Sequence, residues 1–594
     1  MITDQPARPS TPDVNPVSQE AEIITLPPYE VEVDRGKSWR YARIGAIEAL
    51  ARTPDDITVA VVDRYQRLMH MLDFILPPRF RPSYDVPTTL IIEDAVTEPL
   101  VVQELTATLK LRITNVTGDT AVRFMPNFNF RDDDTELLYM VLDPYVQTSN
   151  VITLSASYLG FLLDSNHPPL PSWFIDGLLQ LQDTLMLPVP PATRQITFAS
   201  DPRIFLDPKH PYDEVTVLPF VWGNKKSTDE IIAMVKREAR ISGRPLLPDS
   251  FALTPLEKLL NPRTFTAFTG EEQTLATLQS ALFLRWILDP HPVMPDPDQI
   301  LRPGGKPDAE ALWRFLDRVT QEGFSDKLFV ECFAWSPAEV DVMLRFYLPY
   351  ACLGRGEFRI GSDEMVHPLN ELPLHDATPA ELARLKGRLN RLSIRYVRQH
   401  YPEVLSSYLE QARRNHRRAV ESAQSDPVQL AELGLAEVDA GNDATALPLL
   451  VAAVQGKVVH PRAYYELSRI EMVRLREKDP DLKTVGSELD DIAQQLTTGL
   501  GQKPALAQAY KLLLELWLRK MARLTAAQVA LLDEGARRFP EQFRIIYAAV
   551  LLQTAQGDVK SAERLGTLGM RWLTDQTERD KLGRLMETLH SSKP

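Results

Sequence analysis

Apolar residues in the first quarter of the chain follow a helical spacing first and a strand pattern afterwards. Between Ile57 and Phe74 they recur every three or four residues, which predicts a helix with one buried face. Pro77-Pro78 ends this helix. Short runs rich in Val, Ile, Leu, Phe and Thr then predict four strands: Thr88–Ile92, Leu100–Val102, Ala121–Phe130 and Leu137–Leu142. A helix followed by a group of strands indicates an α+β domain.

A helical hairpin is predicted after the strands. An apolar run begins at Leu154, is interrupted by Asn166-His167-Pro168-Pro169, and resumes at Pro171-Ser172-Trp173 to end near Leu187. Proline is tolerated in the first turn of a helix and disrupts its interior. The segment is therefore expected to form a helix, a short loop and a second helix.

The second helix of this hairpin resembles a known metal-binding segment. Trp173-Phe174-Ile175-Asp176-Gly177-Leu178 is similar to the W-x-x-E-G-L segment of gluzincin-type (peptidase MA-like) zinc metallopeptidases. In that family the Glu is the third zinc ligand, and an H-E-x-x-H helix precedes it. The resemblance implies that Ala156, Ser157 and Gly160 stand where His, Glu and His would be, and that Asp176 replaces the ligand Glu.

The residues at these positions cannot hold zinc as the family does. Two histidines at i and i+4 share one helix face, and a catalytic zinc takes three nitrogen, sulfur or carboxylate ligands from the protein. Ala156 and Gly160 supply no ligand, Ser157 is no base near neutral pH, and Asp176 is a single carboxylate. We expect no catalytic residue, metal or cofactor, only a relict site at Ala156, Ser157, Gly160, Trp173 and Asp176. The alternative is a pair of core helices.

The resemblance also implies an antiparallel edge strand beside the site, to which an extended peptide adds by main-chain hydrogen bonds. It assigns this role to the strand that ends at Arg131-Asp132-Asp133-Asp134. An ordinary acidic turn is the alternative interpretation of these residues.

Further helices are predicted by three- and four-residue apolar spacing after the hairpin. They cover Glu230–Ser242, Gln273–Leu288, Asp308–Gln321, Ser325–Phe333 and Pro337–Leu348. The resemblance places such a helical subdomain behind the site, while a generic α-helical domain explains the same pattern.

Two basic amphipathic helices follow, Pro379–His400 and Glu403–Ser422. Six cations of the first one lie off its leucine stripe: Arg384, Lys386, Arg388, Arg391, Arg395 and Arg398. We expect these cations on a solvated face of helices that link two domains. A basic patch for nucleic acid or membrane is the alternative, but it lacks interleaved aromatic residues.

The C-terminal part shows an internal repeat. Pro427, Pro461, Pro504 and Pro540 are 34, 43 and 36 residues apart, close to the tetratricopeptide (TPR) period. Gly441-Asn442 precedes Ala446 as Gly557-Asp558 precedes Ala562. Such helix pairs stack into a solenoid whose surface commonly binds peptides or proteins. The alternative is a purely structural helical layer on the first domain.

Bulk composition narrows the function classes. The chain has 594 residues and a net charge of -14, which argues against nucleic-acid binding. Cys332 and Cys352 exclude a disulfide framework, leaving one bridge or, as we favour, two buried thiols.

No apolar run is long enough to span a membrane. The first residues lack the regions of a signal peptide. The location stays open between cytoplasm and, if a signal was removed, periplasm or cell exterior.

These patterns divide the chain into a peptidase-like α+β domain and all-α TPR-like repeats. The expected parts are a disordered arm (1–35), a helix with antiparallel strands (36–150), a helical part with the relict hairpin (151–375), linking helices (376–425) and repeats (426–594). The favoured function is non-enzymatic binding of peptide or protein partners through the relict cleft, the solenoid or both. Two alternatives stand beside it: a hydrolase whose metal is held by Asp176 and distant residues, and a scaffold without cleft function.

Overall fold

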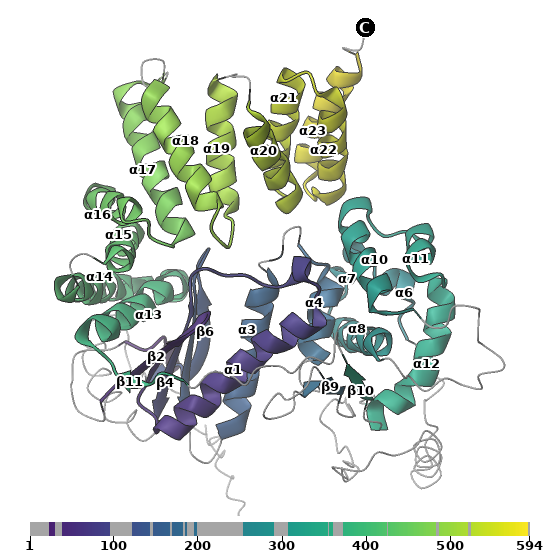
Figure 1. Ribbon diagram of the computed structural model, residues 1–594, viewed down its shortest axis with the longest axis horizontal. Coiled ribbons are helices and arrows are strands. Elements are labelled where there is room, and N and C mark those ends of the chain that lie inside the picture. The colour runs from purple at the N-terminus through teal and green to yellow at the C-terminus, as the bar shows by residue number, and fades with distance from the viewer. Residues whose placement is uncertain are drawn as a thin grey trace, which may run out of the picture.

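The computed structural model shows a body of sheet and helices with a stack of helix pairs along one side of it (Figure 1). The residues that it describes are 23–29, 38–94, 121–142, 147–164, 166, 169–181, 185–186, 195–198, 253–289, 307–353, 356–359, 372–423, 426–480, 482, 486–520 and 524–591. The predicted strand Leu100–Val102 and the predicted helix Glu230–Ser242 lie outside these residues.

Within the described residues, six strands form the central sheet, in the order β11-β2-β3-β4-β7-β6. Their bounds are β2 Arg40–Ile44, β3 Ile47–Ala51, β4 Thr88–Asp94, β6 Asn127–Arg131, β7 Glu136–Leu142 and β11 His375–Asp376. β4 lies parallel to both of its neighbours, β3 and β7, whereas β2, β6 and β11 pair antiparallel. The antiparallel sheet expected from the sequence is therefore wrong, and the sheet is mixed.

The parallel pairing follows from the connection between β3 and β4. Helix α1 (Asp55–Ile75) and the short 3-10 helix η1 (Pro78–Phe80) carry the chain back along the sheet, so that β4 starts at the same end as β3. Parallel neighbours need such a crossover, whereas antiparallel neighbours are joined by a short turn. The strand periodicity alone does not distinguish these two connections.

The hairpin of β2 and β3 was missed by the sequence analysis. Its two-residue turn begins at Gly45, whose φ of 55° is disfavoured for other residues. Arg40, Arg43 and Glu48 interrupt the apolar residues of the two strands, so neither gives a clear strand pattern.

The two faces of the sheet are covered by different helices. Along β7, Leu138 and Met140 belong to the main core with α1, whereas Leu137 and Tyr139 lie in the cluster formed with Leu389 of α13 (Pro379–His400). Alternate residues of a strand point to opposite faces, so β7 is buried from both sides. Helix α13, expected as a linker, covers one face of the sheet.

Part of the expected N-terminal arm is ordered into the fold, so disorder throughout 1–35 is wrong. β1 (Ile23–Leu26) pairs in parallel with β5 (Ala121–Phe124), and Leu26 is fully buried. The hydroxyl of Tyr408 donates to the carbonyl oxygen of Pro27 at 2.6 Å. The predicted strand Ala121–Phe130 is thus two strands, β5 and β6.

The predicted hairpin is present as α3 (Gln147–Asp164) and α4 (Ser172–Leu181). α4 begins as expected, whereas α3 begins at Gln147, before the expected Leu154, and α4 ends at Leu181, before the expected Leu187. The other helices of the body are α6 Leu256–Leu259, α7 Pro262–Phe265, α8 Glu271–Leu288, α10 Ala309–Glu322, α11 Asp326–Phe333 and α12 Pro337–Leu353. A small antiparallel sheet contains β8 Leu185–Met186, β9 Gln195–Phe198 and β10 Gly356–Arg359.

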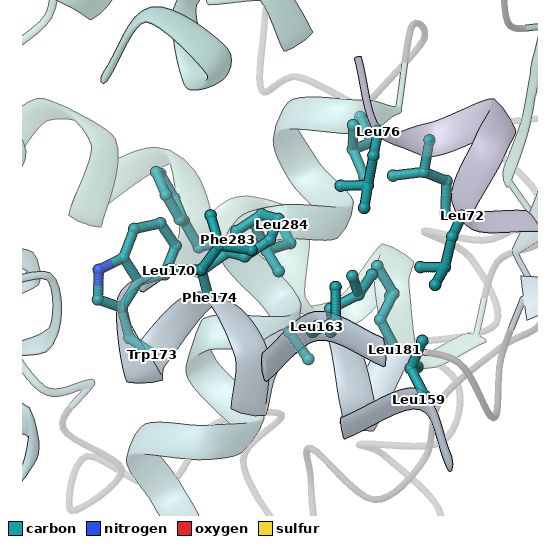
Figure 2. Packing of buried hydrophobic residues seen from close by; sticks show 14 of the residues in the cluster. Leu72, Leu76, Leu159, Leu163, Leu170, Trp173, Phe174, Leu181, Phe283 and Leu284 are labelled. Atoms are coloured by element: carbon teal, nitrogen blue, oxygen red, sulfur yellow. The ribbon is translucent and has the colours of Figure 1, made fainter. Parts of the chain in front are cut away.

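Aromatic and leucine side chains of α4 and α8 form the centre of the main core (Figure 2). Trp173 is fully buried, and its ring lies 5.9 Å from that of Phe283 and 5.8 Å from that of Phe174. Cys332 is also buried, as we favoured, whereas the side chain of Cys352 lies outside the described residues.

The C-terminal half is a TPR-like stack of helix pairs. The helices are α13 and α14 (Leu405–Ser422, after the 3-10 turn η3 Pro402–Val404), α15 Pro427–Asp439, α16 Asp443–Gln455, α17 Pro461–Lys478, α18 Gly486–Leu500, α19 Ala507–Lys520, α20 Ala526–Arg538, α21 Phe543–Ala555, α22 Val559–Trp572 and α23 Gln576–Ser591. Each pair packs on the next, and α13, α15, α17, α19, α21 and α23 contact one another in sequence. We call this series the first-helix row.

One packing device recurs in two successive helix pairs, α17–α18 and α19–α20. A Cβ atom at Gly499 would lie 2.7 Å from the Cβ of Tyr464, and one at Gly535 would lie 2.5 Å from Cδ1 of Tyr510. In both pairs a glycine on the second helix therefore lets a tyrosine of the first helix pack against its backbone. The repeat is preserved in packing geometry and less in residue identity.

Gly177 and Gly160 give a matched test of the hairpin packing. A Cβ at Gly177 would lie 2.9 Å from the backbone carbon of Ser280 on α8, so Gly177→Ala forces α4 and α8 apart. We expect a loss of about 1–3 kcal/mol in the free energy of unfolding, measured by urea titration. At Gly160 the nearest atom would be Cδ1 of Leu179 at 4.0 Å. Gly160→Ala should therefore stabilise the protein by up to about 1 kcal/mol. Equal effects of the two changes would contradict this packing.

Candidate functional site

Four of the five predicted site positions lie around the crossing of α3 and α4. Ala156, Ser157 and Gly160 share one half-buried face of α3, and Asp176 is half-buried on α4. Gly160 approaches Leu179, which follows Asp176 by one helical turn. Trp173 belongs to the main core and contributes nothing to this surface.

The carboxylate of Asp176 has a polar but uncharged neighbour. Gln273 on α8 donates from Nε2 to its Oδ2 at 3.3 Å, and the same Nε2 lies 3.4 Å from the hydroxyl oxygen of Thr277. Burial raises the pKa of Asp176. Within the described ranges no three His, Cys, Asp or Glu side chains are placed to share a metal ion. The described part of the crossing offers hydrogen bonds and no metal ligand set.

A buried acid lies on the face of the sheet that α3 covers, and no pattern in the sequence indicated it. Glu136 of β7 is fully buried, and burial raises the pKa of its carboxyl well above the ordinary value, against a smaller opposing effect of Asn129. The neighbouring pair Arg131–Asp164, at 2.7 Å, is exposed at the rim. Burial therefore shifts the ionisation of Glu136 towards the neutral acid.

A chain of buried ion pairs joins the body to the repeats. Arg388 of α13 binds Glu48 of β3 and Glu432 of α15 at once, and its Nη1 donates to the hydroxyl oxygen of Thr89 at 2.6 Å. Arg384 adds a second pair to Glu48 at 2.6 Å. All of these side chains are buried.

The expected solvated face is wrong for these arginines, whereas Arg395 and Arg398 of the same helix are exposed. Arg384, Arg388 and Arg391 are at most 7% exposed, because α13 is enclosed between the sheet and α15. Desolvation alone would raise the pKa of Glu48, but Arg384 and Arg388 lower it to about 2. No local signal marks these pairs, since Glu48 lies more than 300 residues before its partners.

The acidic turn after β6 is the second part of this junction. Asp132 accepts from Nη1 of Arg391 at 2.6 Å and from Nη1 of Arg462 at 2.9 Å. Asp134, fully buried, accepts from the backbone N–H of Arg462 at 2.8 Å and lies 2.7 Å from Nδ1 of His460. These aspartates therefore bind the repeats and are not free to recognise a peptide.

Asp134 also supplies a helix cap from far away in the sequence. His460, the residue before α17, makes no capping hydrogen bond with its own side chain. The bond from the N–H of Arg462 to Asp134 satisfies one of the free N–H groups of the first turn, where a negative charge also favours the helix dipole.

One edge of the stack rests on the body at further points. The loop between α18 and α19 binds through Lys503, whose N–H donates to Oδ2 of Asp85 at 2.8 Å and whose carbonyl accepts from the N–H of Asp85 at 2.9 Å. At the end of α22, Nε1 of Trp572 donates to the carbonyl oxygen of Thr320 at 2.8 Å. The stack is thus held along its length (Figure 1).

No family model matches the chain, and neither does any curated protein sequence. Three solved structures to which it is similar are the MamA protein, TTC0263, a thermophilic TPR protein from Thermus thermophilus, and the TPR2AB domain of yeast Sti1 in a pHSP90 complex. Identities are 14%, 17% and 14%, and TM-scores are 0.24, 0.23 and 0.16. The matches cover 35%, 33% and 36% of this chain and 94%, 97% and 98% of theirs. No conclusion is drawn from TM-scores this low, so the assignment of TPR-like repeats rests on the helix packing described above.

None of the helices in the described ranges combines the length and the apolar character that crossing a membrane requires.

Arg388→Ala tests the buried junction. The change leaves the carboxylate of Glu432 buried without its nearest cation and removes one of two cations from Glu48. We expect a loss of about 3–5 kcal/mol in the free energy of unfolding, measured by urea titration. Arg318→Ala, which removes exposed pairs with Glu322 and Glu331, is the control and should change stability little. A small effect of Arg388→Ala would contradict the junction.

Proposed function

We propose that this protein is a non-enzymatic scaffold that binds a protein partner on the first-helix row. The observation that carries the proposal is the orientation of the stack. Its edge is fixed on the body at Asp134, Asp85 and Thr320, whereas the broad face of α17, α19 and α21 keeps exposed and half-exposed side chains in the described chain. Repeat stacks commonly bind other proteins through an extended surface of this kind.

An exposed valine on this face, Val473, is a suitable position for a crosslinking test. Val473 of α17 is 41% exposed and lies in the C-terminal part of the helix, where Arg474 and Arg476 are exposed as well. Val330 on α11 of the body has nearly the same exposure, 43%. The two valines therefore differ in location and little in accessibility.

Photo-crosslinking at these valines tests the proposal. A benzophenone amino acid at position 473 should yield a discrete crosslinked protein in the source cell, whereas the same group at position 330 should not. The captured protein, once purified, should bind wild type with one defined stoichiometry and compete for the crosslink at position 473. Crosslinks at both positions, or at neither, would contradict a partner site on the first-helix row.

A second candidate role is that of a metallopeptidase relative whose α3–α4 crossing binds without cleaving. It is supported by chain order: α1 precedes β4, β6 and β7, β6 is an antiparallel edge strand next to β7, and the helix pair α3–α4 follows β7. Ala156, Ser157 and Gly160 on one face of α3, close to α4, fit the same interpretation.

Introducing the zinc ligands of the gluzincin family tests the relationship to that family. The variant Ala156→His, Ser157→Glu, Gly160→His and Asp176→Glu places two imidazoles one turn apart near a carboxylate, and Gly160 has room for a side chain. We expect it to retain zinc after dialysis and to show a zinc-dependent rise in Tm, because zinc binds only the folded state. A folded variant that holds no more zinc than wild type would leave α3 and α4 as two core helices.

A further inference from the structure

The repeats already bind one acidic segment, which belongs to the same chain. Asp132 lies against Arg391 and Arg462, and Asp134 lies against His460 and the first turn of α17. Nε2 of Gln508 on α19 lies 3.4 Å from Oδ2 of Asp133. The start of α17 and of α19 therefore recognises carboxylates with cations, an amide and a helix N-terminus.

The surface that begins at these residues continues along the row. On α17, Arg469 and Arg476 follow Arg462 at intervals of seven residues, and on α19, Lys511 and Arg519 follow Gln508 at intervals of three and eight. Residues at such spacings share one helix face. Arg476 and Glu515 pair at 2.5 Å between the two helices, so both stripes face the same side.

This side carries six cations in a chain whose net charge is -14. We call it the cationic face; its cations are Arg462, Arg469, Arg476, Lys511, Arg519 and, on α21, Arg544. Four of these cations pair with carboxylates besides the acidic turn: Arg462 with Asp439, Arg469 with Asp443 and Glu466, and Arg476 and Arg519 with Glu515. Within the described ranges no ion pair is formed by Lys511 or Arg544, and the half-exposed ring of Tyr547 lies one turn beyond Arg544.

We propose that the cationic face binds an acidic segment of a protein partner, next to the acidic turn that it holds in its own chain. This inference rests on the proposed function and adds the chemistry of the partner. Charge complementarity supports it, because unpaired cations attract a carboxylate-rich segment. Continuity with the junction supports it as well, because Arg462 and Gln508 belong both to the face and to the contact with the turn.

The test uses the full-length protein and a fluorescein-labelled peptide, Gly-Asp-Asp-Phe-Asp-Asp-Gly, read by fluorescence anisotropy. Wild type should bind this peptide, and binding should weaken as salt is added. The same peptide with Asn in place of every Asp should not bind. Absence of binding by the Asp peptide, or equal binding of both peptides, would overturn the acidic class of partner.

Two charge-reversal variants locate the site. Lys511→Glu with Arg544→Glu should weaken binding by roughly tenfold or more. Arg537→Glu with Lys560→Glu makes the same change in net charge on the exposed sides of α20 and α22, and binding should stay within roughly twofold of wild type. Equal losses in both variants would show attraction by overall charge and would overturn the site.

Peptide binding and crosslinking at position 473 test the acidic class of partner and the scaffold role separately. A partner captured at position 473 together with no binding of the acidic peptide would reject the acidic class and keep the scaffold role. No captured partner and no bound peptide would reject both. Melting curves of both variants verify that they are folded, so that a loss of binding reports the surface.

Discussion

The guanidinium of Arg388 is the constraint on which the arrangement of the molecule depends. It lies fully buried between Glu48 of the sheet and Glu432 of the first repeat. A buried charge is tolerated only when it is paired and hydrogen-bonded, so the three elements that carry these groups must lie in one relative position. The sheet, α13 and α15 are thereby joined through polar groups as well as through the apolar contacts of α13. The repeats are therefore fixed on the body at this point.

This fixation determines which surface of the stack is left for a partner. Contacts at Asp134, Asp85 and Thr320 all involve the edge where one pair leads to the next. Because the edge is used, the broad face of the first-helix row stays accessible in the described chain, and its cations are held at set distances from the body. A partner would meet a preformed surface and would not have to order it, which favours affinity.

Features that depend on neighbouring residues, such as helix bounds, were predicted from the sequence. The bounds of α13 agree to the residue with the prediction, because Pro379 stands in its first turn and a capping box closes its N-terminus. The burial of its arginines was not predictable from α13 alone, since Glu48 lies 340 residues away from Arg388. At the hairpin, helical spacing predicts the shared face of the relict positions on α3, whereas the neighbour of Asp176, Gln273, comes from another helix.

The role of the acidic turn could not be predicted from its sequence motif alone. Three successive aspartates at the end of an edge strand are compatible with a solvated turn or a recognition site. In the fold, Asp134 caps α17 and Asp132 pairs with both Arg391 and Arg462. These carboxylates occupy the start of the cationic face, so a partner segment cannot use Arg462 without displacing a buried contact. Binding must therefore depend on the cations beyond Arg462, above all Lys511 and Arg544, which form no ion pair with a carboxylate in the described chain.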